Sequence, residues 1–368
     1  MNTLPLYLQP EARFDCHRCG VCCRSDLGVL LEPGDRENLE LHDWSEEGVR
    51  FEAGFLRPSP EPTEPSRLRV EDGACVFLDD DNSCLVHMRL GGSEKPVRCQ
   101  AFPFRFAAMP VAIQMSVSTE CASLHRSFDC GTLIEESKEL IELSEAVPRL
   151  LIVGEQFVLR YGEPPRLSWD DVYAGLEDVA GAAASATPFE DLPWAVARAV
   201  RRYLDGPAPP TPWEYEGPPQ VPFYQCLDHL GDLLVPIAGS LGLSRLESAF
   251  AAMRRWMVWR GAARSLEPLA EAFLRFQLRS LTYELRPLQL GQLAGGVGSA
   301  LYLVMATAVG AARAGQVQRA GAVGNAAEAN AVAREASAFY GSPAALALME
   351  ENLLVFERLI FDAPRPGP

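Results

Sequence analysis

The sequence predicts a mainly α protein with a small cysteine-rich, mixed α/β N-terminal domain, residues 1–130, followed by a mainly helical domain, residues 131–368. Two observations predict this division. Nine of the ten cysteines lie between Cys16 and Cys130, whereas apolar residues recur at helical spacing from Glu135 onward, in a region rich in Ala, Leu and Arg. A hydrophobic content of 48% in 368 residues provides ample material for packed cores.

The beginning of the chain is expected to contain short strands, turns and loops. Residues 28–43, GVLLEPGDRENLELHD, predict a short strand, a Pro-Gly turn and the start of a helix. The prolines of RPSPEPTEPSRLRV predict an extended surface loop at residues 57–69, because proline cannot donate the hydrogen bonds that regular structure needs.

Residues 73–88, GACVFLDDDNSCLVHM, predict two short strands joined by an Asp-Asp-Asp-Asn turn. A turn centred between Asp79 and Asp80 places Cys75 directly opposite Cys84, because the two residue numbers lie symmetrically about it. Opposite residues of a hairpin hold their Cβ atoms about 5 Å apart. The two thiolates would then be close enough to bind one metal ion.

The second domain is expected to consist of helices interrupted by one proline-rich segment. Helical spacing is present in residues 136–147, ESKELIELSEAV, and TPFE at residues 187–190 predicts a capping box at the start of another helix. Residues 208–222, APPTPWEYEGPPQVP, predict a linker or a groove-lining loop. Helical patterns then resume and continue across residues 224–361.

One uncharged stretch, between Arg286 and Arg313, is long enough to span a bilayer. Its proline, glutamines and five glycines make it poorly apolar, and no aromatic belt flanks it. We therefore expect a buried helix of a bundle and no membrane contact. Small residues such as Gly295 and Ser299 would let a neighbouring helix approach closely.

The acidic composition bears on the class of partner. A formal charge of −16 and a pI near 4.9 create a field that repels nucleic acid and anionic lipid. We therefore expect a protein substrate or partner and no nucleic acid. The denser groups of arginines are expected to be solvated or ion-paired; they are Arg198, Arg201, Arg202, Arg254, Arg255 and Arg260.

The leading segment MNTLPLYLQPEARF has no positive region followed by an apolar core, so it does not resemble a secretory signal. We therefore expect a cytoplasmic protein. In a reducing cytosol, clustered thiols are more often metal ligands or catalytic groups than disulfides. Cys22 and Cys23 are also too close in sequence to bond each other without strain.

The segment FDCHRCGVCCRSD places Cys16, Cys19 and Cys22 in the spacing C-x2-C-x2-C. This spacing lets one loop supply three thiolates to an iron–sulfur cluster, while zinc sites use its C-x2-C half. Gly20 is expected to take a positive φ that turns backbone N–H groups toward the sulfurs. Cys23 points away from Cys22, which suggests a second site or a second metal.

Eight thiols are enough for two four-coordinate centres or one polynuclear centre, and the sequence leaves their division open; they are Cys16, Cys19, Cys22, Cys23, Cys75, Cys84, Cys99 and Cys121. His17 and His87 are more often outer-sphere or surface groups than ligands at such positions. Cys130 and Cys226 are expected to be spare, and Cys226 to be a core residue.

In their order along the chain, CHRCGVCC, CVFLDDDNSCLVH, KPVRCQAFPF and STEC resemble the CxxCxxCC cysteine-cluster family, which is described as zinc- or iron-chelating and includes flagellin lysine N-methylase-like proteins. The resemblance covers roughly residues 14–125. It implies that the eight cysteines are the metal ligands, with Pro96, Phe102 and Pro103 as structural parts. Lys95, Gln100 and Ser123 depart from the Arg, Arg and Gly that are usual in the family.

Three functions follow as expectations. The first is a metal protein that holds an iron–sulfur cluster, zinc or iron. The second, implied by the resemblance, is a protein-lysine N-methyltransferase that uses S-adenosylmethionine; GGVGSA at residues 295–300 lacks the strand–turn–helix context of a nucleotide loop, and no C-x3-C-x2-C is present. The third is a structural zinc domain that mediates interactions, in which ions replace a hydrophobic core.

Overall fold

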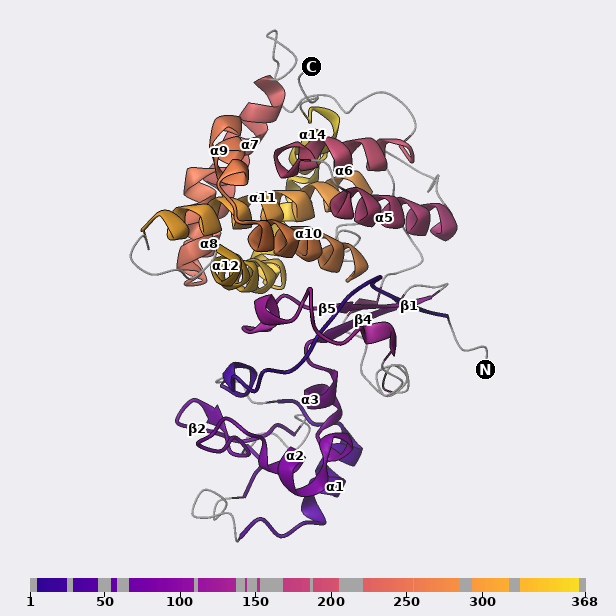
Figure 1. Cartoon of the computed structure of the whole chain (residues 1–368), viewed down its shortest axis with the longest axis vertical. Helices are drawn as coiled ribbons and strands as arrows, with labels where there is room; N and C mark the ends of the chain where they lie inside the picture. The colour runs from indigo at the N-terminus through magenta and orange to yellow at the C-terminus, as the bar shows by residue number, and fades with distance from the viewer. Residues whose placement is uncertain are drawn as a thin grey trace.

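The computed structural model describes residues 5–24, 29–45, 54–57, 66–108, 112–136, 143, 151–152, 168–185, 188–204, 221–253, 255–284, 293–317 and 325–363. Figure 1 shows a layer of helices at the top, a small sheet beneath it, and a separate lobe of short elements at the bottom. Most regular structure is helical, and the strands are few and short. The prediction of a mainly α protein with a mixed α/β front is confirmed.

The cysteine-rich lobe, residues 16–24, 29–45, 54–57 and 66–101, contains three short helices and one two-stranded sheet. The helices are α1 (Pro33–Glu40), α2 (Leu85–Leu90) and α3 (Val97–Ala101), with the 3-10 turns η1 (Val21–Cys23) and η4 (Gly92–Glu94). Strand β2 (Val70–Glu71) pairs antiparallel with β3 (Ala74–Cys75). The lobe core consists of Leu31, Leu39, Trp44, Leu68, Val76, Phe77, Leu85 and Val86.

Helix α1 forms where the sequence predicts it, but the predicted Pro-Gly turn is wrong. Pro33 and Gly34 are its first two residues, and Glu32 is the N-cap. Asp35 Oδ2 accepts a hydrogen bond from the Glu32 N–H at 2.9 Å and completes a capping box. Proline suits this position because the first helical N–H needs no partner within the helix. Most of the predicted loop, residues 58–65, lies outside the described residues.

The predicted hairpin register is also wrong. Cys75 pairs with Val70, and Cys84 forms a bridge with Leu78, so the two cysteines do not face each other across a ladder. The intervening turn is closed by Asp79, whose Oδ1 accepts hydrogen bonds from the backbone N–H of Asp81 at 3.0 Å and of Ser83 at 2.6 Å. This side-chain turn competes with strand pairing.

The four-stranded sheet lies between the lobe and the helices (Figure 1). Its order is β1 (Leu6–Leu8), β5 (Ile113–Val117), β4 (Phe104–Ala108) and β6 (Leu151–Ile152). Strands β4 and β5 are antiparallel, while β1 runs parallel to β5 and β6 parallel to β4. The central strand β5 is buried along its whole length.

The sheet has one apolar and one polar face, because side chains alternate along each strand. The register places Tyr7 beside Gln114 and Arg105 beside Ser116 on the same face. Gln114 and Ser116 are buried, although both are polar.

The polar face of the sheet points toward the helices. Tyr7 stacks on Tyr173 with ring centroids 4.5 Å apart, and Gln9 Oε1 accepts a hydrogen bond from Ser280 Oγ at 3.1 Å. Three buried atoms of this layer have no hydrogen-bond partner among the described residues: Gln9 Nε2, Gln114 Oε1 and Ser116 Oγ. Sheet and helices therefore meet across a polar seam.

The helical body occupies the described part of residues 168–363. Its helices are α5 (Trp169–Ala184), α6 (Leu192–Arg201), α7 (Val221–Ser240), α8 (Ser244–Ala252), α9 (Trp256–Arg264), α10 (Pro268–Tyr283), α11 (Leu293–Val317), α12 (Asn325–Tyr340), α13 (Pro343–Glu351) and α14 (Leu353–Phe361). Figure 1 shows α11 passing through the middle of this body. The prediction of a mainly helical second part is confirmed.

Helix α11 is the buried helix that the sequence predicts. Residues Leu293–Gly315 are long and apolar enough to cross a membrane by length and composition, and 94% of the most apolar window is buried inside the protein. A Cβ atom added at Gly295 would lie 2.7 Å from Leu353, and one added at Gly298 would overlap the Phe356 carbonyl oxygen. The small residues therefore let α14 approach closely, as predicted. The absence of membrane contact stays a prediction.

The start of α6 differs from the prediction. Residues Phe189–Asp191 form a 3-10 turn, η7, and α6 begins only at Leu192. Glu190 forms ion pairs instead of a cap. Its Oε1 lies 3.0 Å from Arg260 Nη2, and its Oε2 lies 2.6 Å from Arg264 Nε. Thr187 lies outside the described residues. The same holds for most of the predicted helix and of the proline-rich connector, at residues 137–142, 144–147 and 208–220.

Buried residues form two hydrophobic clusters in the described part of the chain. One is confined to the lobe, and the other combines strands β4 and β5 with the helices from α5 to α14. Residues before and after position 130 therefore share the larger core. The domain boundary at residue 130 stays a prediction.

Candidate metal centre

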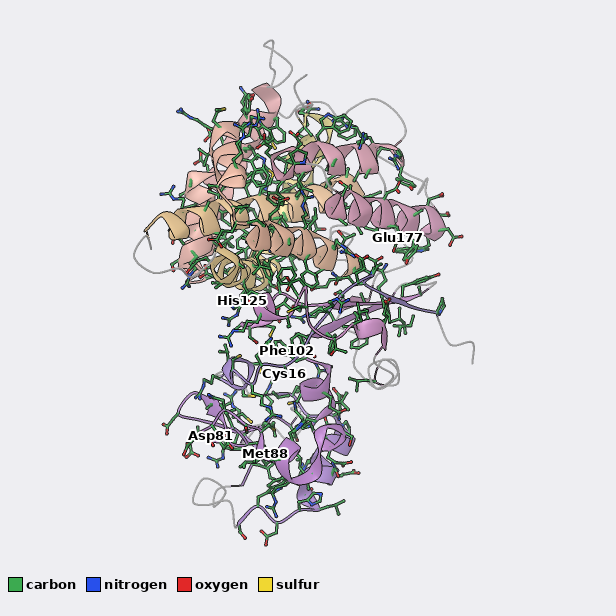
Figure 2. All side chains as sticks on the ribbon, viewed as in Figure 1. Cys16, Asp81, Met88, Phe102, His125 and Glu177 are labelled. Carbon is green, nitrogen blue, oxygen red and sulfur yellow. The ribbon has the colours of Figure 1, made fainter. Side chains whose placement is uncertain are left out.

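The loop Cys16–Cys23 links the sheet to the lobe. Figure 2 shows Cys16 and Phe102 at the narrow junction between the two. Gly20 has a φ of 70°, as the sequence predicts, and the 3-10 turn η1 follows it directly. This turn carries Cys22 and Cys23, whose sulfur atoms are 3.9 Å apart. The prediction that Cys23 points away from Cys22 is therefore wrong, because the 3-10 turn brings the two side chains together.

Gly20 serves a second purpose that the sequence does not reveal. A Cβ atom at this position would lie 2.5 Å from Asn82 Oδ1, which accepts a hydrogen bond from Arg24 Nη2 at 2.6 Å. Both Gly20 and Asn82 have positive φ. The cysteine loop therefore packs against the turn that leads into Cys84.

Three thiols border the lobe core. Cys75 lies on β3, Cys84 is the N-cap of α2, and Cys99 lies on α3. All three are half-buried and pack against the small hydrophobic cluster. They are also close enough for electrostatic interaction, since charge on Cys75 or Cys84 would oppose ionisation of Cys99.

Cys121 belongs to the other core. It is buried, packs with the sheet and the helical body, and lies 3.6 Å from Ser123 Oγ. Charge on Cys19 or Cys22 would oppose its ionisation, so these thiols also interact.

Packing links the cysteine loop to the later cysteines of the lobe. Gly20 of the loop contacts Asn82 in the turn that leads into Cys84, and Cys75, Cys84 and Cys99 border one small core. Negative charge on Cys22 would also oppose ionisation of Cys75, Cys99 and Cys121. Cys75 and Cys84 do not face each other in a hairpin.

The surroundings favour neutral thiols over isolated thiolates. The hydrogen bond with Cys23 raises the pKa of Cys22 above its ordinary value, although Cys22 is exposed. Burial raises the pKa of Cys75 to about 11, and it also raises the pKa of Cys99 and Cys121. A bound metal cation would offset the repulsion between thiolates and displace the protons.

The chemistry of this donor set fits zinc or iron. All ten cysteines are free, and thiolates are the ligands that zinc and iron–sulfur clusters prefer. Among the described residues, no three Cys, His, Asp or Glu side chains already surround one point at ligating distance. Coordination of a metal ion would therefore require the thiols to move closer together around it.

The remaining candidates lie elsewhere. Cys16, His17, His87 and Cys130 are exposed, and the role of Cys16 as a ligand stays a prediction. Cys226 is fully buried on α7, where its thiol donates a hydrogen bond to the Val355 carbonyl at 2.9 Å. The prediction that Cys226 is a core residue is confirmed.

Lys95 is a residue of this region whose importance the sequence analysis missed. It precedes α3, and its positive charge favours the thiolates of Cys22 and Cys99. The signal was its place in KPVRC, where it stands at the position of the family's usual arginine. A cation beside the thiols compensates part of their negative charge when they bind metal.

Residues 15–124 match the model of a family named CxxCxxCC, which carries the description "Putative zinc- or iron-chelating domain". This part of the chain is similar to the CxxCxxCC family. The matched range includes all eight predicted ligands, from Cys16 to Cys121. It spans the lobe, strands β4 and β5, and the segment that follows β5.

An uncharacterized protein of Methanocaldococcus jannaschii is 25% identical over 134 residues. The similarity covers 35% of this chain and 43% of the archaeal protein, so it spans less than half of that relative's length. No solved structure matches the chain.

Proposed function

We propose that the protein binds zinc or iron, as ions or as an iron–sulfur cluster, through the eight cysteines of the region similar to the CxxCxxCC family. These ligands are Cys16, Cys19, Cys22, Cys23, Cys75, Cys84, Cys99 and Cys121. The observation that carries the proposal is the packing of the cysteine loop, through Gly20, against the turn that leads into Cys84, beside the core that Cys75, Cys84 and Cys99 border. Neighbouring thiolates repel one another, so a bound cation would stabilise them together.

The bound metal would join the lobe to the rest of the protein. Cys75, Cys84 and Cys99 are fixed to the lobe core, whereas Cys121 is fixed to the core shared by the sheet and helices. Zinc would supply a redox-inert cross-link between them, and an iron–sulfur cluster would add one-electron transfer. The C-x2-C-x2-C spacing of the first loop favours the cluster.

Methyl transfer from S-adenosylmethionine remains the weaker proposal. The glycines of GGVGSA lie inside α11, where Gly295 and Gly298 pack against α14. These glycines therefore serve helix packing and are not available to cradle a nucleotide. Support for a lysine-bearing protein substrate comes only from the charge of −16, which would attract cationic segments.

The proposal includes a cytoplasmic location and a protein partner in place of nucleic acid. A reducing compartment would keep all ten cysteines free for metal binding. The acidic surface would repel phosphate backbones and anionic lipids.

Replacement of Cys22 with serine tests the proposal most directly. Because Cys22 is the third cysteine of the C-x2-C-x2-C loop, Cys22→Ser should lose most of the metal that wild-type protein carries. Cys130→Ser is the matched control, since Cys130 is exposed and lies in the same half of the chain. Metal content after anaerobic purification, measured by mass spectrometry, checks both; equal metal in the two variants would contradict the ligand assignment.

Acid-labile sulfide and the visible absorption spectrum of the same samples distinguish the metals. Iron with matching sulfide and broad visible absorbance would identify a cluster. Zinc without sulfide would identify a structural site and direct the search toward a binding partner.

A further inference from the structure

The backbone around Cys121 is held by one side chain of α12. Asn330 Nδ2 donates hydrogen bonds to the carbonyl oxygens of Thr119 at 3.3 Å and Cys121 at 3.1 Å. Asn330 Oδ1 accepts a hydrogen bond from the His125 N–H at 3.3 Å and lies 2.9 Å from His125 Nδ1. Figure 2 shows His125 directly below α12. Asn330 is only 1% exposed, so the amide is committed to this segment.

A second set of contacts holds the preceding residue, Glu120. Arg334 Nε donates a hydrogen bond to the Glu120 carbonyl at 3.1 Å, and Ser337 Oγ donates one to Glu120 Oε1 at the same distance. Arg105 of β4 forms an ion pair with the Glu120 carboxylate. Three side chains on successive turns of α12 thus form hydrogen bonds with the segment that carries Cys121.

This arrangement differs from that of the lobe cysteines. Cys75, Cys84 and Cys99 take their positions from the lobe core. The position of Cys121 is set by a helix more than 200 residues later in the chain, as the separation of 209 residues between the Asn330 amide and the Cys121 carbonyl shows. A change in α12 is therefore transmitted to one thiol of the proposed centre.

We propose that Asn330 is a positioning residue for the metal centre, and that metal binding at Cys121 and the order of α12 are energetically coupled. The inference rests on the proposed function, since it requires Cys121 to be a ligand. Mutation of a residue that hydrogen-bonds to a metal ligand typically lowers metal affinity about 10- to 100-fold. Because coupling is reciprocal, metal binding must in turn stabilise the part of α12 that grips the ligand.

Asn330→Ala and a matched control on the same helix test this coupling. Val332 is also buried on α12, but it faces Gly310 of α11 and not the Cys121 segment. Val332→Ala therefore removes packing from the same helix without touching the hydrogen bonds to Thr119 and Cys121. Zn²⁺ affinity is measured by chelator competition, and Co²⁺ loading gives a thiolate charge-transfer band that reports on the sulfur ligands.

Asn330→Ala should weaken Zn²⁺ binding about 10- to 100-fold and reduce the Co²⁺ thiolate band, whereas Val332→Ala should leave both close to wild type. Wild-type affinity in Asn330→Ala, or an equal loss in Val332→Ala, would overturn the inference while leaving the proposed function intact. Wild-type protein that binds neither ion would overturn the proposed function itself, and the inference with it.

Hydrogen exchange on wild-type protein covers the case in which Asn330→Ala fails to fold. Zn²⁺ loading should slow exchange in residues 325–340 and leave residues 192–201 of α6 unchanged. Equal exchange in α12 with and without Zn²⁺ would overturn the coupling.

Discussion

The lobe and the helical body solve the problem of stability in different ways. The lobe core has eight buried hydrophobic residues among those described, and its elements are short turns of helix and two-residue strands. The helical body surrounds α11, which is buried almost throughout, with long amphipathic helices. Because hydrophobic stabilisation grows with buried apolar area, the body can fold by packing alone. The lobe has a much smaller core, and we propose that metal bound by its thiols supplies part of its stability.

The cysteines are distributed unevenly between the lobe and the helical body. Seven of the eight predicted ligands lie in the lobe, whereas Cys121 packs in the larger core and Cys226 in the helical body is an ordinary core residue. Most of the thiols therefore lie in the part of the chain that has the smaller hydrophobic core.

Metal removal should give the largest effect. Chelation of wild-type protein under reducing conditions is expected to unfold the lobe and leave the helical body folded, because structural zinc contributes about 10–16 kcal/mol to small domains. Trp44 is buried in the lobe core and reports on its unfolding by fluorescence, with the other tryptophans as background. Far-ultraviolet circular dichroism reports on the helices. Simultaneous unfolding of the lobe and the helical body would contradict the view that the two are stabilised in different ways.

A substitution in α11 should affect the helical body alone. Gly298→Ala adds a methyl group that overlaps the Phe356 carbonyl oxygen, so α11 and α14 must separate. We expect a loss of about 3 kcal/mol in the free energy of unfolding, measured by chemical denaturation, with unchanged metal content.

Gly261→Ala in α9 is the matched control for Gly298→Ala, since a Cβ atom at Gly261 meets no atom within 4 Å. It should stabilise the protein by about 0.5–1 kcal/mol, because alanine is the better helix former. A similar gain in Gly298→Ala would show that the α11–α14 contact adjusts freely.

The smallest effect concerns pH. Hydrogen bonds from Arg264, and then from Arg260, lower the pKa of Glu190 to about 2. A lowered pKa stabilises the folded state above the ordinary value of 4.5 and loses that contribution as pH falls toward 2. Arg264 is largely exposed, so Glu190→Gln should cost less than about 1 kcal/mol at neutral pH. Thermal unfolding at pH 7 and pH 2.5 checks it; an undiminished difference at the lower pH would contradict the assignment.

The sequence predicted the fold class, the positive φ of Gly20 and the close packing of α11, because each depends on a local pattern of residue types. It failed where two local patterns compete. Pro33 and Gly34 fit a turn and a helix start equally well, and the capping box decided for the helix. The Asp79 side chain replaced the expected hairpin with a turn of its own.

The candidate site shows the same limit. Spacing identified the loop cysteines, a hairpin register that the structure contradicts pointed to Cys75 and Cys84, and the resemblance implied the full set of eight. The contact of Asn82 with Gly20 and the grip of Asn330 on Cys121 depend on segments 62 and 209 residues apart. Pairings at that distance leave no periodic trace in a single sequence.

The polar seam between the sheet and the helices has a consequence for how these two layers fit together. Burial of apolar side chains is non-directional, whereas hydrogen bonds and ion pairs need particular partners at particular distances. The layers share a hydrophobic core, so burial favours their contact in any register. The polar pairs of the seam, such as Gln9 with Ser280 and the Cys121 segment with Asn330, select one register.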